Sequence, residues 1–227
     1  MDYKPAEMIM IEDKELELLL AAAGISKWYG IRSGSGGVDY ENDGAVNEIL
    51  AHLYQKGLID WHDGKAKIAD VIRPAVRVMK EAVSCITVSR TDRQEDLICC
   101  YFGSGKAVCI GRDSMSPDEL ELSVTDAGLW PDKLKADSYL PEVADYPDLS
   151  DPMKLGSSAA GCTGELITLL ERYNITDGKL TGSILLYDDG MYGHYEMKSD
   201  SGEMLEKSDY RQKDIFRILL RWAGVEL

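Results

Sequence analysis

The sequence predicts an α+β protein built on one antiparallel sheet of pseudo-two-fold symmetry, which helices flank and a winged-helix-like N-terminal portion precedes. The first observation is a block that occurs twice, at residues 97–123 and again at 183–208. In each copy an apolar strand reaches a tyrosine, a glycine turn reverses the chain, and an acidic loop follows the second strand. The second observation is a change from the apolar spacing of helices to the alternation of strands after residue 83.

We expect one integrated domain with four portions. They are a helical, winged-helix-like portion at 1–83, a first β-unit at 84–140, a connection at 141–162, and a second β-unit with a C-terminal helix at 163–227. A length of 227 residues is enough to bury a full hydrophobic core.

The N-terminal portion is predicted to contain three helices and a hairpin. In chain order these are a helix at 14–24 that Gly24 ends, a helix at 44–56 that Asp43 caps, a hairpin of 58–61 with 66–68 around an Asp-Gly turn, and a helix from 69 or 70 to about 83. Leu16, Leu19 and Leu20 give the first helix an apolar stripe. Pro74 is compatible with the first turn of the last helix.

The first β-unit is predicted as an antiparallel meander, because its apolar residues alternate. The expected strands are 85–89, 96–102, 107–111 and 119–124, followed by a short helix within 125–140. Three prolines between residues 141 and 152 are incompatible with regular structure, so we expect a connection that runs over the surface.

The second β-unit is predicted to open with a helix from Thr163 to Tyr173, which Thr163 caps and which buries Leu166, Leu169 and Leu170. Strands are expected at 180–187 and 191–198, followed by a final helix at 209–223 that closes the core.

The charge of the chain argues against two classes of partner. Forty acidic side chains against 25 basic ones give a net charge of -15, so the average surface repels nucleic-acid phosphates and anionic lipids. No apolar run approaches the roughly 18 to 20 residues that span a bilayer. We therefore expect a cytoplasmic protein that neither binds nucleic acid nor inserts into a membrane.

Cysteine and histidine usage predicts no metal and no cofactor. The five cysteines form no C-x-x-C and fit small apolar core positions: Cys85, Cys99, Cys100, Cys109 and Cys162. The three histidines are too scattered to suggest zinc ligands: His52, His62 and His194.

Three further patterns have a chemical interpretation and a simpler one. The stretch 102–107 resembles the end of a phosphate-binding loop, but it lies between two strands and predicts a hairpin turn. The glycines at 156–161 precede a predicted helix and are compatible with an anion site beside Cys162; a linker and an inert thiol are the simpler interpretation. Two acidic clusters lack the order of a calcium loop and predict solvated turns: Asp145, Asp148 and Asp151, and Asp188 with Asp189.

A candidate partner-binding patch follows the first β-unit. Trp130 lies with Leu129 and Leu134 beside the prolyl connection, where we expect an exposed edge. Large aromatic side chains next to aliphatic ones are typical anchors of protein interfaces.

The order of elements resembles the EspG-type chaperones of type VII secretion. The points of contact are the opening 15–25, the helix end at 53–59 and the repeated hairpin units. The resemblance implies a quasi-two-fold domain with a central antiparallel sheet between helical bundles, which binds a helical secretion substrate in the cytosol and shields its apolar tip. In that family the substrates are of the PE and PPE kind; other hosts require another cargo, such as WXG-type or LXG-type helical proteins.

The hypothesis from the sequence is a non-enzymatic protein-binding module, a cytosolic chaperone or adaptor for helical type VII secretion substrates. Two alternatives stay open at this point: a winged-helix-related regulatory protein, and an enzyme whose site is scattered along the chain. The pattern leaves the oligomeric state open.

Overall fold

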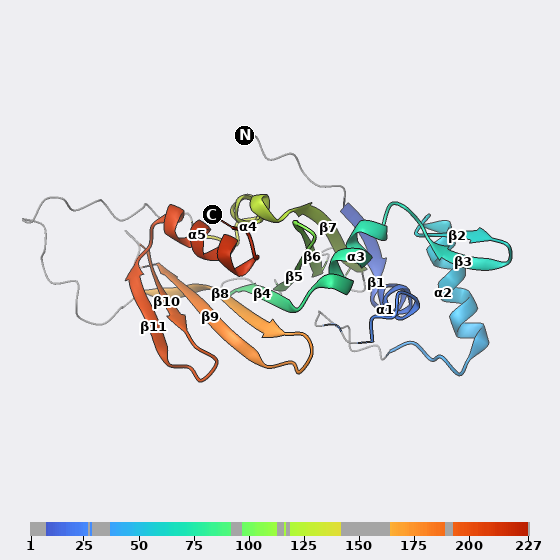
Figure 1. Cartoon of the computed structure of the whole chain (residues 1–227), viewed down its shortest axis with the longest axis horizontal. Coiled ribbons are helices and arrows are strands. Elements are labelled where there is room, and N and C mark those ends of the chain that lie inside the picture. Colours follow the sequence, from blue (N-terminus) through green and yellow to red (C-terminus); the bar gives the residue numbers. More distant parts are fainter. Residues whose placement is uncertain are drawn as a thin grey trace, which may run out of the picture.

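The computed structural model describes residues 8–26, 28, 37–91, 97–112, 116, 119–141, 164–188 and 193–226. This described part is a mixed α+β structure with five α-helices, a nine-stranded antiparallel sheet and a separate two-stranded hairpin (Figure 1). The α+β class predicted from the sequence is therefore confirmed.

The elements follow one another in two groups. The N-terminal group comprises β1 (Met8–Glu12), α1 (Asp13–Ala22), α2 (Asp43–Gln55), the hairpin of β2 (Ile59–His62) and β3 (Lys65–Ile68), and α3 (Arg73–Glu81). The rest comprises β4 (Ser84–Arg90), β5 (Leu97–Gly103), β6 (Lys106–Arg112), β7 (Glu119–Asp126), η1 (Ala127–Leu129), α4 (Trp130–Ala136), β8 (Glu165–Asn174), β9 (Leu180–Asp188), β10 (Gly193–Lys198), β11 (Met204–Asp209) and α5 (Gln212–Trp222).

The large sheet consists of two four-stranded meanders that lie side by side, with β1 as one more strand at an edge. Its order is β1-β7-β6-β5-β4-β8-β9-β10-β11, so β4 and β8 pair at the junction of the meanders. That pairing runs from Ser84 opposite Asn174 to Arg90 opposite Thr168. Each meander is followed in the chain by a helix, α4 after the first and α5 after the second.

Two hydrophobic cores lie on opposite faces of the sheet. On one face, α1 and α3 cover the first meander, and Leu16, Leu20 and Met79 share one core with the strand residue Tyr101. On the other face, α4 and α5 cover both meanders and pack on strand residues of each, including Ile86, Cys100, Leu170 and Ile184. Because neighbouring residues of a strand point to opposite faces, Cys85 and Ile86 belong to different cores.

Local sequence explains most of the N-terminal elements. The stripe of Leu16, Leu19 and Leu20 is buried, as predicted, and Gly24 follows α1 with a φ of 77°. The predicted hairpin and the position of the proline in the first turn of α3 are also confirmed. The predicted cap of α2 is wrong: the side chain of Asn42, not Asp43, accepts hydrogen bonds from the backbone N–H groups of the first turn.

The helix predicted at 163–173 is wrong, because residues 165–174 form the strand β8. The leucines at 166, 169 and 170 fit a helical stripe, yet this segment pairs with β4 on one side and β9 on the other. Two ladders of backbone hydrogen bonds and the β-branched pair Ile167 and Thr168 outweigh the local helical pattern. The proposed cap Thr163 and residues 142–162 of the connection lie outside the described residues.

Two strands at the sheet edges were not expected as strands. Residues 8–12, which precede the first predicted helix, form β1, which pairs with β7. Residues 204–209, between the last predicted strand and the final helix, form β11, which pairs with β10. The final helix begins at Gln212 rather than residue 209 for the same reason, since β11 extends to Asp209.

Two neighbouring leucines of β8 provide a test of the strand. Leu170 is fully buried in the core beneath α5, whereas Leu169 is half-buried and points to the opposite face. We expect Leu170→Ala to lower the free energy of unfolding by about 3 kcal/mol and Leu169→Ala by about 1 kcal/mol or less, measured by urea titration. Equal losses would instead fit a helix that buries both leucines on one stripe.

Candidate protein-binding surface

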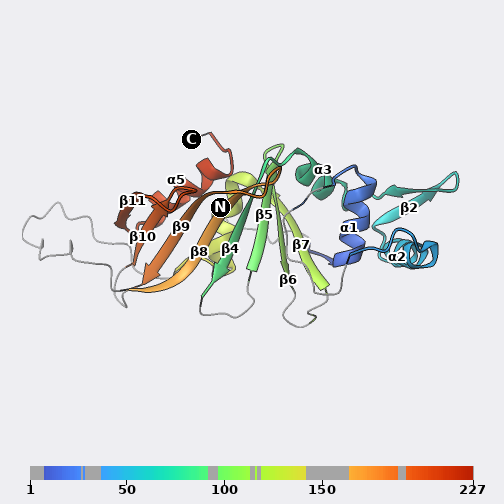
Figure 2. The same ribbon diagram turned by 90° about the horizontal axis from the view of Figure 1, so that it is seen from below.

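The second meander has one face that no helix of the described residues covers. We define this open face by the residues of β8, β9 and β10 that point away from α4 and α5: Leu166, Leu169, Glu171, Ser183, Leu185, Tyr187, His194, Glu196 and Lys198. In Figure 2, β8 and β9 lie in front and α4 lies behind the sheet. The corresponding face of the first meander packs against α1 and α3.

The centre of the open face is apolar. Leu169 and Leu185 lie directly opposite each other on β8 and β9, and both are half-buried without belonging to either core. Tyr187 lies opposite His194, and their rings stack with centroids 4.8 Å apart and planes 6° from parallel. Directly opposed side chains on one face of a sheet form a continuous contact surface. The open face therefore offers an apolar strip with a flat aromatic end.

A charged cluster borders this strip. The carboxylate of Glu196 lies 3.4 Å from the ammonium of Lys198 and 3.3 Å from that of Lys207, and the hydroxyl of Tyr187 donates to it at 3.4 Å. Burial of Glu196 by itself would raise its pKa, but the hydrogen bonds from Lys207 and Lys198 outweigh burial, so the pKa is lowered. The cluster thus keeps a carboxylate ionised beside the leucines.

The edge strand next to the open face carries two exposed apolar side chains. In β11 the exposed fraction is 44% for Met204 and 63% for Leu205. In the described part of the chain, β11 has a sheet neighbour on one side only, which is β10. The backbone groups on the outer side of such a strand are available for pairing with another chain.

The patch predicted from the sequence lies elsewhere. Trp130 and Leu134 are fully buried in the core beneath α4, where the ring of Phe102 meets that of Trp130 edge-on with centroids 4.7 Å apart. Leu129 is half-buried. The structure therefore places Trp130 and Leu134 in the core on the far side of the sheet from the open face, where they offer no contact area to a partner in this conformation.

Sequence reasoning missed Leu169, Leu185 and Tyr187. The helical interpretation of 163–173 put Leu169 on the same buried stripe as Leu170. The alternation in β9 gives apolar residues on both faces, Ile184 and Leu186 on one and Leu185 and Tyr187 on the other. That two-sided pattern is typical of a strand with both faces covered, so the open face has no signal in the sequence alone.

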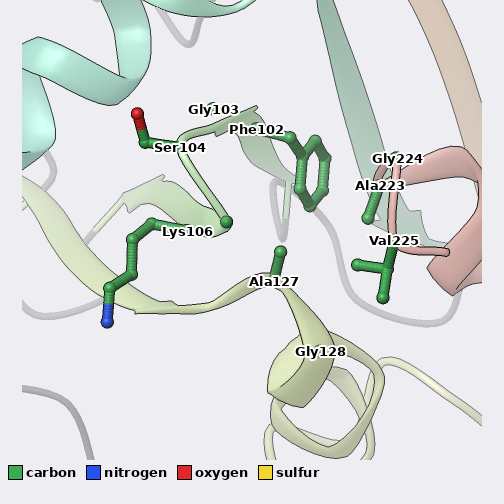
Figure 3. A pocket seen from close by; sticks show the side chains of 10 residues that line it. Phe102, Gly103, Ser104, Lys106, Ala127, Gly128, Ala223, Gly224 and Val225 are labelled. Atoms are coloured by element: carbon green, nitrogen blue, oxygen red, sulfur yellow. The ribbon is translucent and has the colours of Figure 1, made fainter.

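The glycine-rich stretch 102–107 is a hairpin turn, as predicted. Ser104 and Gly105 have φ values of 49° and 71°, which is typical of the two-residue turn that joins twisted antiparallel strands. A cavity of about 330 Å³ lies between this turn, residues 127–128 and the C-terminal end of α5. In Figure 3 the side chains of Ser104 and Lys106 point away from the space between Phe102, Ala127 and Val225.

The cavity is a poor phosphate site. The ammonium of Lys106 is paired with the carboxylate of Asp126 at 2.6 Å. The carbonyl end of α5 borders the cavity at Ala223 and Gly224, and the carbonyl end of a helix carries partial negative charge. Both features disfavour an anion.

Four cysteines occupy core positions, as predicted. Cys85, Cys99, Cys100 and Cys109 are all buried, and the sulfur atoms of the last two lie 3.2 Å apart on facing strands. Burial raises the pKa of Cys85 and Cys100 well above the ordinary value of a thiol. The remaining candidates lie outside the described residues: Cys162, the glycines at 156–161, the aspartates at 145, 148 and 151, and Asp189.

The chain was compared with family models and with curated proteins. No family model matches this chain, and no curated protein matches it either. Among the residues that the structure describes, no helix is both long and apolar enough to cross a membrane.

The charged cluster predicts a pH dependence of stability. Because the pKa of Glu196 is lowered below its ordinary value of 4.5, its carboxylate stabilises the fold above that pH, and the stabilisation is lost as the pH falls through the folded-state value. We expect Glu196→Gln to be less stable than the parent chain at pH 7 and equally stable below that range, measured by urea unfolding across pH. Glu203→Gln, at an exposed position, serves as the control and is expected to match the parent. A Glu196→Gln deficit that is independent of pH would contradict this prediction.

Proposed function

We propose that the protein is a non-enzymatic binding protein that holds an amphipathic helix of a partner on its open face. We further propose that it acts in the cytoplasm as a chaperone or adaptor for helical type VII secretion substrates. The observation that carries the proposal is the pair of half-buried leucines, Leu169 and Leu185, on a sheet face that no described helix covers. An apolar strip with a charged border suits the apolar face of a helix.

The arrangement of the two meanders supports this choice of occupant. The order of strands is mirrored about the β4–β8 pair, and α4 and α5 follow their meanders onto the same face of the sheet. We infer a pseudo-two-fold axis through that pair. On the first meander the other face is covered by α3, which packs Ala75, Val76 and Met79 on it. The axis relates the α3-covered face of the first meander to the open face of the second. A partner helix on the open face would therefore take the position equivalent to α3.

Charge supports an escort role. A net charge of -15 limits self-association of a protein that has half-buried apolar side chains on the open face and exposed ones on β11. The same charge attracts a partner whose apolar stripe has basic flanks, since Glu171 and Glu196 border the leucine pair.

The alternative of a DNA-binding winged helix lacks a supporting observation. The helix–hairpin–helix order of α2, β2, β3 and α3 suits that architecture, and we keep the likeness as architecture alone. Arg73 is paired with Asp70, and the guanidinium of Arg77 lies 2.9 Å from the carboxylate of Glu81. These pairs neutralise two of the basic residues that a phosphate backbone would need.

The proposal predicts which surface substitutions abolish binding. We expect the double variant Leu169→Ser, Leu185→Ser to lower the affinity for a helical secretion substrate at least about tenfold, because it removes the apolar centre of the site. The measurement is co-expression with WXG-type and LXG-type substrates, recovery of the complex, and calorimetric titration of the purified pair.

Two matched variants locate the surface. Val83→Ser removes a more exposed apolar side chain, 74% exposed, outside the open face, and Trp61→Ser removes the exposed ring of the hairpin. Both are expected to bind like the parent chain. Failure to form a complex with any of these substrates counts against the escort role, and loss of binding only in Trp61→Ser would move the site to the hairpin.

A further inference from the structure

A second cluster lies at the other end of the molecule, where the β1–α1 junction meets the last turn of α2 (Figure 1). Glu12, Glu15 and His52 each offer one ligand atom there, and these atoms all lie within 4.8 Å of one another. The two glutamates are three residues apart at the start of α1, and the histidine comes from a different helix. This cluster is independent of the open face and of the proposed escort role.

The backbone holds the two glutamates in fixed positions. They form a reciprocal capping box, in which the side chain of Glu12 accepts the backbone N–H of Glu15. In return, Oε2 of Glu15 accepts the backbone N–H of Glu12 at 2.8 Å. Side chains held by such contacts lose little freedom when they bind a ligand.

One oxygen of the cluster is buried without a hydrogen bond. The side chain of Glu15 is 1% exposed, and its Oε2 also accepts a hydrogen bond from the ammonium of Lys56 at 2.7 Å. Among the described residues, Oε1 of the same carboxylate has no hydrogen-bond partner. A buried carboxylate oxygen is normally satisfied, so this atom points to a missing donor or cation.

The local charge favours a divalent cation. Lys56 lies between Glu15 and Glu119, 3.8 Å from the carboxylate of Glu119. With Glu12 this makes three carboxylates around one ammonium, which leaves two negative charges by simple count. A divalent ion would neutralise them while Lys56 stays on Oε2 of Glu15.

We propose that Glu12, Glu15 and His52 bind a zinc ion. Two carboxylates and one imidazole are ligands that zinc accepts, with water in the fourth position, whereas magnesium and calcium prefer oxygen ligands throughout. Zinc–ligand bonds of about 2.0–2.2 Å require the ligand atoms to approach closely, and the exposed side chain of His52 supplies that movement. Leu53 is the only fully buried residue of α2 in the described part of the chain. The ion would attach this helix to the edge of the sheet.

The test is calorimetric titration of the full chain, freed of metal with a chelator, with zinc chloride. We expect one zinc ion per chain and a higher melting temperature with zinc than without. His52→Ala is expected to bind at least about tenfold more weakly and to melt like the metal-free parent, since this exposed side chain leaves the fold intact. His62→Ala removes an exposed histidine of β2 outside the cluster and serves as the matched control.

Three results would overturn the zinc assignment. The first is no heat of zinc binding by the parent chain, and the second is unchanged affinity in His52→Ala. The third is tighter binding of magnesium or calcium than of zinc. Glu12→Gln provides a second variant that keeps the buried Glu15–Lys56 pair intact, and it is also expected to weaken zinc binding.

Discussion

The antiparallel pairing of β4 with β8 is the constraint on which the rest of the structure depends. It joins the two meanders edge to edge, and it places β4 in the middle of the sheet. Cys85 of β4 then packs in the core beneath α1 and α3, while Ile86 and Val88 pack in the core beneath α4 and α5. A strand that contributes to both cores couples the two halves, so loss of this pairing would expose apolar surface on both faces.

Local sequence predicts the elements whose partners are near in the chain. The strands β4 to β7 form by hairpin steps, and the left-handed turn at Ser104 and Gly105 is visible as a glycine-rich break between apolar runs. The stripe of α1 is equally local. β8 could not be predicted this way, because its pairing with β4 joins residues about 80 positions apart and its leucines also fit a helix. The open face depends on that same long-range pairing, which explains why sequence reasoning chose Trp130 instead.

The two meanders differ in what covers them, and this difference gives the molecule an asymmetric surface. Residues 73–81 form α3 on the first meander and bury Val76 and Met79 against it. On the second meander the corresponding strands present Leu169 and Leu185, which remain half-buried in the described part. The first meander therefore carries a helix on this face, and the second carries none among the described residues.

The charges around the leucine pair oppose the self-association that an open apolar site promotes. Partly exposed leucines promote self-association, and an edge strand such as β11 adds unpaired backbone groups. The long side chain of Lys198 lies beside Glu196 on the open face, so its alkyl stem can lie along the sheet while the ammonium stays hydrated. A partner helix with basic flanks would gain contact with the carboxylates of this border, whereas a second copy of this acidic chain would meet like charge. The charged border therefore disfavours contact with a second copy of this chain, as the proposed escort role requires.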